Sequence, residues 1–565
     1  MNKKWFYLLS AIILLASLLR LYDLGKTPLG LEWDEVALGY DAYSILKTGR
    51  DQFGSFLPLT FRSIDDYKPP LYEYVTVPSV ALFDLNEFST RLPSAFAGII
   101  TVILTALLVY QIVLSIPALR SNARKISLVS SLSLAISPWH LQFSRAAFEV
   151  NISVLITVLA VTSFLYGLKN KKLFLLSALF FGLNFFSYHS ARVVSPLLMI
   201  SLFLLFHKSL PIKKYILYFF IIWLTFFAGF IPILMSKDAQ IRFSATNIFK
   251  PGARSLSDRD LETIFLEKRS QDNLAGFDMA GKIFHNQRLI YTDYESLRNA
   301  FSNYLSHFDF NFLFIKADAP LHHAPGFGLL YIVELPLILL GLIYILKKGL
   351  NRSSFFILLW IMFVPIPSSI TKGAPHAVRT EIILPTFQIL SGWGLILLIN
   401  FLQKESKLFR DAGSALISIA FLINISFYLH QYYVHTNYEA SSYWLHSRKE
   451  AVEATEKLKN QYDRVLISPR VEVPLDFWLF YTKYSPEKYL NEGGTISGGF
   501  ADDRNHFDKY EFKYFDYNNL PKDQKILLVG TNNSLPNDFP GLANIIKTIY
   551  NRDGTNALLF AENRH

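Results

Sequence analysis

Residues 92–115 read LPSAFAGIITVILTALLVYQIVLS and contain no charged side chain. A helix that crosses the hydrocarbon core of a bilayer needs about 20 predominantly apolar residues, and this run satisfies that length. Further apolar runs follow along a chain of 565 residues, of which 51% are hydrophobic and 15% aromatic. The sequence therefore predicts an integral membrane protein built mainly from helices.

About eleven membrane-spanning helices are expected. Their approximate limits are 5–22, 92–115, 126–138, 150–167, 172–187, 192–207, 214–234, 327–346, 354–370, 378–401 and 411–430. Lys and Arg gather in every second connection, as at Lys169, Lys171 and Lys172. The positive-inside rule places those connections and the N-terminus in the cytoplasm, and the other connections outside. This topology explains the formal charge of +10, so nucleic acid is not an expected partner.

The chain divides into two predicted domains. Residues 1–430 form the transmembrane domain, with external loops at about 23–91 and 235–328, and residues 431–565 form a small external α/β domain. Residues 71–83 are apolar but too short to span the membrane, and they include Glu73. They are expected to form a helix that lies in the membrane interface.

The last 135 residues or so show the pattern of an α/β domain. Ser447-x-x-Glu450 is a capping-box pattern, which predicts a helix from there to about Asn460. Arg464–Ser468 and Lys525–Val529 read as strands, and Asp553-Gly554 as the turn between two final strands. No motif in this part indicates catalysis.

The predicted external face carries an unusual set of charged residues. Asp34-Glu35 follows the first span, and carboxylates near a bilayer are costly unless they are solvated or paired. The short external turns each carry a cation that the positive-inside rule disfavours, and an anionic lipid phosphate is a natural partner for such cations. These cations include Lys68, Arg145, His189, Arg192, His376 and Arg379.

Simpler readings of these residues stay open. Asp34-Glu35 fits a solvated loop, and Arg145 and Glu149, four residues apart, fit an ion pair on a helix surface. Arg192 and Arg379 also fit side chains that extend to lipid head groups without specificity. The neighbouring His322 and His323 do not by themselves indicate a zinc site.

Taken together, the motifs resemble those of bacterial membrane glycosyltransferases of the GT-C fold class, related to protein O-mannosyltransferases and lipid A aminoarabinose transferases. The resemblance covers about residues 5–430. Its motifs are Trp33-Asp34-Glu35, Tyr67-Lys68-Pro69-Pro70-Leu71, Glu87-Phe88-x-x-Arg91-Leu92-Pro93, Ser144-Arg145 with Glu149, and Pro375-His376-x-x-Arg379. It implies an all-α polytopic membrane bundle of about eleven transmembrane helices, followed by a small extracytoplasmic α/β domain.

The resemblance also implies roles for individual residues. Asp34 matches the acidic residue taken as general base, and Glu35 would assist it or hold the acceptor. Lys68 matches the lysine that contacts the carrier phosphate. The remaining residues of the expected donor phosphate and sugar site are Tyr67, Arg91, Arg145, Glu149, His189, Arg192, His376 and Arg379. Glu149 stands where relatives often have Asp, which leaves its role in doubt.

The expected activity is inverting transfer of a sugar from a polyprenyl-phosphate carrier to an acceptor hydroxyl on the outer face of the cytoplasmic membrane. The acceptor class stays open between a protein, a glycan and a lipid, and the motifs do not identify the sugar. Asp34 and Glu35 offer oxygen ligands for a divalent metal. No cofactor is expected, however, because the members that the chain resembles most transfer sugar without one.

A flippase or transporter of a lipid-linked sugar is the alternative. Transporters hold charged residues near the bilayer midplane, often at broken helices. The candidate residues here lie at one face instead, which favours an enzyme.

Overall fold

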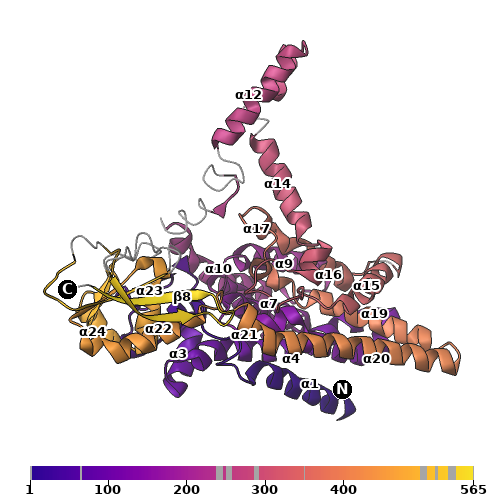
Figure 1. The fold of residues 1–565 in the computed structure, drawn as a ribbon. Coiled ribbons are helices and arrows are strands. Elements are labelled where there is room, and N and C mark those ends of the chain that lie inside the picture. Colours follow the sequence, from indigo (N-terminus) through magenta and orange to yellow (C-terminus); the bar gives the residue numbers. More distant parts are fainter. Residues whose placement is uncertain are drawn as a thin grey trace.

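The computed structural model describes residues 3–63, 67–236, 246–249, 258–285, 292–348, 350–496, 505–515, 520–531 and 543–563. A helical bundle forms most of the molecule, and the C-terminal part, orange to yellow in Figure 1, forms a sheet domain at one end of it. Two helices, α12 (Asp258–Leu274) and α14 (Thr292–Ser306), project away from the bundle (Figure 1).

Apolar helices of very different lengths, from 28 residues down to 4, make up the bundle. They are α1 (Lys3–Leu21), α4 (Glu87–Leu114), α5 (Ala123–Ile136), α6 (Pro138–Phe143), α7 (Glu149–Gly167), α8 (Lys171–Leu183), α9 (Ala191–Phe206), α10 (Lys213–Leu234), α15 (Leu335–Lys348), α16 (Arg352–Phe363), α17 (Pro365–Ser369), α18 (Ala377–Thr380), α19 (Thr386–Leu402) and α20 (Lys407–His430). Short turns of helix extend or link them: η1 (Pro117–Asn122), η2 (Asn184–Phe186), η3 (His207–Ser209), η6 (Asn311–Ile315), η7 (Ile332–Glu334), η8 (Glu381–Ile383) and η9 (Gln431–His435). Buried aromatic and aliphatic side chains from these helices form the largest core of the molecule.

Among the described residues, seven helices are long and apolar enough to cross a membrane, or eight if the bent pair Ala377–Ile383 and Thr386–Leu402 counts as one span. The expected spans 126–138, 172–187 and 327–346 coincide instead with α5, α8 and α15, which have 14, 13 and 14 residues. At about 1.5 Å per residue such helices are shorter than the roughly 30 Å hydrocarbon core. The multi-pass architecture is confirmed, but the count of eleven is not.

Two helices and a small hairpin follow α1 and lie against the C-terminal domain. They are α2 (Trp33–Thr48), β1 (Phe61–Arg62), β2 (Tyr67–Lys68) and α3 (Leu71–Phe83). A capping box starts α2, because the Glu32 side chain accepts from the Asp34 N–H and the Glu35 side chain accepts from the Glu32 N–H. The box places Asp34 and Glu35 in the first turn of α2. The 13 residues of α3 form a helix as predicted, and its place in the membrane interface stays a prediction.

A six-stranded mixed sheet forms the centre of the C-terminal domain, with strand order β4-β5-β3-β6-β8-β7. Its strands are β3 (Arg464–Ile467), β4 (His506–Phe507), β5 (Tyr510–Phe512), β6 (Ile526–Gly530), β7 (Ala543–Tyr550) and β8 (Asn556–Asn563). Its helices are α21 (Thr436–Glu439), α22 (His446–Leu458), α23 (Pro474–Thr482) and α24 (Pro486–Asn491), with the turns η10 (Lys459–Gln461) and η11 (Pro469–Val471). The two expected strands and the final turn are confirmed within a residue or two.

One local prediction in this domain is wrong. The helix expected after Ser447 is present as α22, but it begins at His446 after Leu445 in a left-handed conformation, and no side chain caps it. The Ser447 hydroxyl accepts from Arg448 instead. The capping-box pattern therefore predicted the helix for a reason that the structure does not use.

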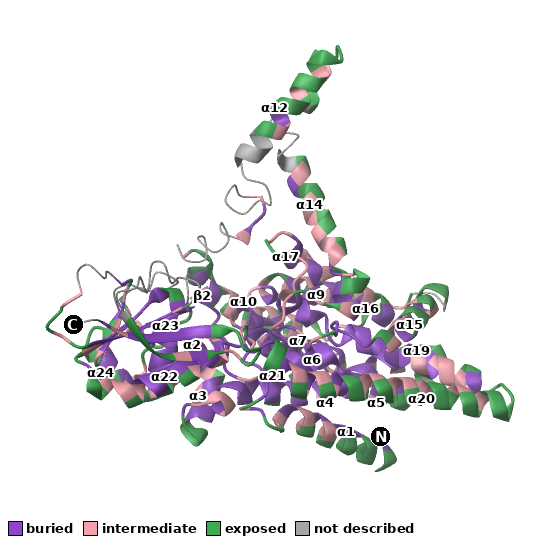
Figure 2. Cartoon of the chain, viewed as in Figure 1, coloured by how far each residue is buried: buried purple, intermediate pink, exposed green. Residues whose placement is uncertain are grey.

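The C-terminal domain packs directly on α2. Val36 and Tyr40 of α2 share one buried core with Trp478 and Phe480 of α23. Figure 2 shows α2 and α23 next to each other, and both are largely buried. Gly30, just before α2, has φ +89°, and a Cβ on it would lie 2.5 Å from the Trp444 carbonyl oxygen. Only glycine fits so close an approach. The position of the first turn of α2 therefore depends on the C-terminal domain.

Candidate functional site

Lys68 lies between two carboxylates that come from different helices. Its Nζ is 2.9 Å from Asp34 Oδ1 and 3.4 Å from Glu149 Oε1. The Lys68 side chain is 7% exposed, whereas that of Asp34 is 43% exposed. The hairpin of β1 and β2 fixes the lysine, and Pro69-Pro70 turns the chain from β2 into α3. The result is a charged centre in which one acid stays open to solvent.

Glu35 has a different environment from Asp34. Arg91 of α4 makes two parallel bonds to it, from Nε to Oε1 at 2.8 Å and from the second terminal nitrogen to Oε2 at 2.8 Å. The backbone N–H of Ala147 also donates to Glu35 Oε1 at 2.8 Å. Arg91 is fully buried and donates further to the carbonyls of Leu24, Pro28 and Gly30. We therefore interpret Glu35 and Arg91 as residues that hold the fold, not as the catalytic and donor-binding residues that the motifs suggested.

Arg145 is likewise bonded within the protein. Each of its three guanidinium nitrogens donates to a protein oxygen, and Nε reaches the hydroxyl of Tyr432 at 3.2 Å. The other acceptors are the carbonyls of Leu19, Arg20, Tyr22, Asp23 and Thr27. The guanidinium thus fixes the loop between α1 and α2, and its expected role as a phosphate contact does not fit this geometry.

Three other predicted residues lie at two places: Tyr67 is next to Lys68, and His189 and Arg192 lie at the start of α9. Tyr67 precedes Lys68 in β2, and alternation along the strand directs its side chain to the opposite face. His189 and Arg192 are joined by a 2.7 Å contact between His189 Nδ1 and a terminal nitrogen of Arg192. The Arg192 guanidinium also lies 4.8 Å from the ring centre of Phe230. These contacts connect the pair to α10.

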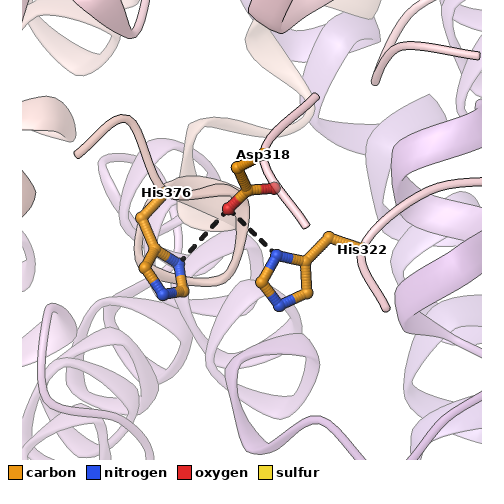
Figure 3. A group of neighbouring side chains, drawn as sticks. All are labelled: Asp318, His322 and His376. Atoms are coloured by element: carbon orange, nitrogen blue, oxygen red, sulfur yellow. Dashed lines mark ion pairs between the residues drawn. The ribbon is translucent and has the colours of Figure 1, made fainter. Parts of the chain in front are cut away.

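His376 belongs to a second polar group, with Asp318 and His322 (Figure 3). Asp318 Oδ2 lies 2.9 Å from His322 Nδ1 and 3.7 Å from His376 Nδ1, and one ligand atom from each residue lies within 4.8 Å of the others. Arg379 stands beside this group, and its guanidinium donates to Thr371 Oγ1 at 2.7 Å.

The donor set of this group suits a divalent cation. Burial and Arg379 lower the pKa of His376 to about 3, so its imidazole is neutral at pH 7, the form that binds metals. Burial opposes ionisation of Asp318, but its contacts with His322 and, less strongly, with His376 lower the pKa of that carboxyl to about 2. Two imidazoles and one carboxylate are ligands typical of zinc. Sequence reasoning missed the group because His322 pairs with residues 4 and 54 positions away, not with its neighbour His323.

One segment contacts both groups. The His322 ring centre is 5.8 Å from that of Phe148, the residue before Glu149. Gln142 Nε2 donates to the Leu321 carbonyl at 2.7 Å. Residues 142–149 therefore connect the metal-type group to the Lys68 group, which Glu149 contacts.

Sequence reasoning also missed the buried acids around Lys68. Glu73 was noted only as a reason against a span, yet it is 1% exposed in the first turn of α3. Burial raises its pKa, and the charges of Glu149 and Asp34 raise it further. Asp476 of the C-terminal domain is also buried, and its pKa is raised to about 7. A carboxylate inside an apolar segment was the available signal for Glu73.

Comparison with known proteins concerns one segment of the chain and its fold. The model of the dolichyl-phosphate-mannose-protein mannosyltransferase family matches residues 67–235, which include Lys68, Arg91 and Glu149. No curated protein matches the chain at a significant level of sequence similarity.

Two solved proteins share the fold over most of the chain. ArnT from Cupriavidus metallidurans, both in the apo state and bound to undecaprenyl phosphate, aligns with TM-score 0.53 and 12% identity over 99% of this chain and 98% of ArnT. The oligosaccharyltransferase AglB from Archaeoglobus fulgidus, in complex with an inhibitory peptide and a dolichol-phosphate, aligns with TM-score 0.50 and 13% identity over 85% of this chain and 63% of AglB. The chain is thus a multi-pass membrane protein that shares its fold with ArnT and AglB, and its residues 67–235 match the mannosyltransferase family model.

Proposed function

We propose that this protein transfers a sugar from a polyprenyl-phosphate carrier to an acceptor hydroxyl, with inversion at the anomeric carbon, on the outer face of the cytoplasmic membrane. The observation that carries the proposal is Lys68, held between Asp34 and Glu149 within the segment that matches the mannosyltransferase family. The two structural neighbours contain undecaprenyl phosphate and dolichol-phosphate, which supports a carrier of this class.

The ammonium group of Lys68 suits the donor phosphate. As the bond between the anomeric carbon and the phosphate oxygen breaks, the electron pair stays on the phosphate, and its growing charge needs a nearby cation. Lys68 is buried and fixed by its hairpin, so it supplies this charge without reorganisation. Glu149 holds the ammonium from the other side, 3.4 Å away, and keeps it in place when Asp34 changes partner.

Asp34 suits the acceptor. Its carboxylate is the more exposed of the two that bind Lys68, so a phosphate can take over the lysine while Asp34 turns to an incoming hydroxyl. The acceptor oxygen then bonds to the anomeric carbon from the face opposite the phosphate, and its proton passes to Asp34. General base assistance of this kind contributes about 10²–10⁴ in rate. Attack opposite the leaving phosphate inverts the anomeric configuration.

No metal takes part in this proposed step. Lys68 provides the positive charge that a metal ion would otherwise supply to the phosphate, and the metal-type group of Asp318, His322 and His376 includes neither of the carboxylates that pair with Lys68. We therefore expect the transfer rate in EDTA to equal the rate without it. A loss of transfer that Zn²⁺ or Mn²⁺ restores would contradict this part of the proposal.

A liposome assay tests the proposal. The purified protein is offered labelled polyprenyl-phosphate sugars and a crude cell-envelope fraction as acceptor, as wild type, as Asp34→Asn and as Asp84→Asn. Asp84 is a matched control, because it also pairs with a lysine, Lys483, but is 61% exposed. Transfer by the wild type and the control, but not by Asp34→Asn, supports the proposal. Label that crosses the bilayer equally with all three proteins, without transfer, indicates a flippase of lipid-linked sugars instead.

A further inference from the structure

Glu73 is a buried acid for which the part of the chain that the structure describes offers no hydrogen-bonding partner. It lies in the first turn of α3, directly after the Lys68 hairpin, and is 1% exposed. Among the described residues, neither carboxyl oxygen of Glu73 has a hydrogen-bond partner. Glu35 shows the usual solution for a buried carboxylate, since an arginine and a backbone N–H satisfy both of its oxygens. The fold thus satisfies one buried acid beside the site and leaves the other open.

The surroundings of Glu73 are those of the proposed donor site. Glu149 raises the pKa of Glu73 most strongly after burial itself, while Lys68 lowers it and Asp34 raises it. Helix α3 packs against α2 and α7, the helices that carry Asp34 and Glu149. The charge of Glu73 also raises the pKa of Asp41 in α2, so a third acid lies near Glu73. Among the described residues that act on the pKa of Glu73, Lys68 is the single cation. Asp34 and Glu149 already share this lysine.

A carboxyl in this position suits a hydroxyl ligand. Buried polar groups in native proteins nearly always have partners, so an open pair of oxygens next to a reaction centre indicates a partner that binds there. With its proton, a carboxyl offers one donor and one acceptor at adjacent atoms, and a sugar hydroxyl offers the same two functions in return. Phosphate does not suit the position, because three acids already surround it.

We propose that Glu73 binds a hydroxyl group of the transferred sugar and so sets which sugar the enzyme accepts. The inference rests on the proposed function, since it concerns the same donor. Glu73 acts here as a specificity residue: it holds the sugar ring while Lys68 holds the phosphate. A site that hydrogen-bonds a substrate hydroxyl rejects the analogue that lacks it, because the buried group then stays unpaired.

Binding measurements in detergent test the role without turnover. Wild type, Glu73→Leu and Glu73→Gln are titrated with polyprenyl phosphate and with its mannose, glucose and galactose esters, and then with monodeoxy forms of the ester that binds best. We expect Glu73→Leu to bind that ester about 10–100-fold more weakly and polyprenyl phosphate as the wild type does. We also expect one deoxy ester to be rejected by the wild type and not by Glu73→Leu.

Thr76→Val is the matched control. Thr76 is buried one turn further along α3, and its hydroxyl donates to the Tyr72 carbonyl. Thr76→Val should change neither the affinity for the sugar ester relative to polyprenyl phosphate nor the discrimination against the deoxy ester. Equal loss of affinity for polyprenyl phosphate and its sugar ester in Glu73→Leu, or unchanged discrimination against every deoxy ester, would overturn the role.

The remaining outcomes also decide. If Glu73→Leu does not fold, Glu73→Met, titrated with the same ligands, carries the test, because a thioether offers no donor and only a weak acceptor. Discrimination against the deoxy ester should then be lost, while Glu73→Gln, whose amide keeps a donor and an acceptor, should keep part of it. Unaltered discrimination in Glu73→Met overturns the proposal. If the wild type binds sugar esters and discriminates between them but never transfers the sugar, the role of Glu73 stands and the proposed transfer fails.

Discussion

Asp34 and Glu35 are adjacent acids in one helical turn, yet their surroundings are opposite. Asp34 is 43% exposed and contacts a lysine, while the side chain of Glu35 is 4% exposed and both of its oxygens are bonded. The first carboxylate is open to a reactant, and the second joins α2 to α4. Residue type therefore does not distinguish the functional acid from the structural one, and the number of fixed partners does.

The largest expected effect comes from Asp34→Asn. The amide keeps the shape of the side chain but cannot accept the proton of the acceptor, so turnover should fall by about 10²–10⁴. The melting temperature should equal that of the wild type. Asp34 is partly exposed, and Lys68 keeps its other partner, Glu149, when Asp34 is changed. Initial rates in liposomes and thermal unfolding in detergent measure the two. Normal turnover in this variant would remove Asp34 as the base.

Arg91→Ala tests the opposite side of the comparison. Removing one partner of a buried ion pair leaves the other charge uncompensated, which costs about 3–5 kcal/mol. We expect a large loss of melting temperature and of expression. Arg91→Lys should lose most of the same stability, since lysine cannot make the two parallel bonds. If Arg91→Ala folds well and loses only donor binding, the structural role is wrong and Arg91 belongs to the donor site.

Lys68→Ala should have an intermediate effect. A hydrogen bond to a charged group contributes about 1.5–3 kcal/mol, which corresponds to roughly 10–100-fold in affinity for polyprenyl phosphate. Lys483→Ala removes the matched lysine of the exposed pair with Asp84 and should leave donor affinity unchanged. Titration of both variants with polyprenyl phosphate measures these affinities. Unchanged affinity in Lys68→Ala would exclude Lys68 from the phosphate site.

The sequence allowed much of this arrangement to be predicted, and the limits have physical causes. Apolar runs and basic connections predicted the membrane bundle, but not that α5, α8 and α15 are too short to span alone. Motif order brought Asp34 and Lys68 together correctly. It could not separate Asp34 from Glu35, because the difference arises from Arg91 and the Ala147 N–H, which lie 56 and 112 residues from Glu35 along the chain.

The same limit applies to cations and to the metal-type group. Arg145 carries the charge that phosphate recognition needs, yet backbone carbonyls of the loop after α1 bind its guanidinium. Such carbonyls have no signature in sequence, since every residue has one. His322 was weighed beside His323, its neighbour in sequence, while its neighbours in space are Asp318 and His376. Long-range proximity, not residue type, decided both cases.

Asp476 sharpens the comparison, because it is buried and, among the described residues that act on its pKa, no cation offsets the effect of burial. Burial is the largest cause that raises the pKa of this carboxyl from 3.8 to about 7, Asp34 raises it slightly, and a bond from Gln52 opposes the rise. The folded protein thus holds a proton that the unfolded chain releases above about pH 4. Stability from this proton is complete below about pH 4 and is lost as the pH rises through about 7.

Asp476→Asn should remove that dependence and leave transfer unchanged. The amide cannot ionise, so the variant should melt at the wild-type temperature near pH 4 and above it at pH 8. The shift should be less than about 2–4 °C for each kcal/mol, because that range holds for 150–250 residues and falls as chains become longer. Melting curves at both pH values measure the difference. Asp41 and Asp51 titrate in both proteins, so the difference between the curves reports Asp476 alone. A variant less stable than the wild type at pH 8 would show that Asp476 is ionised and paired, as Glu35 is, and would place it on the structural side of the comparison.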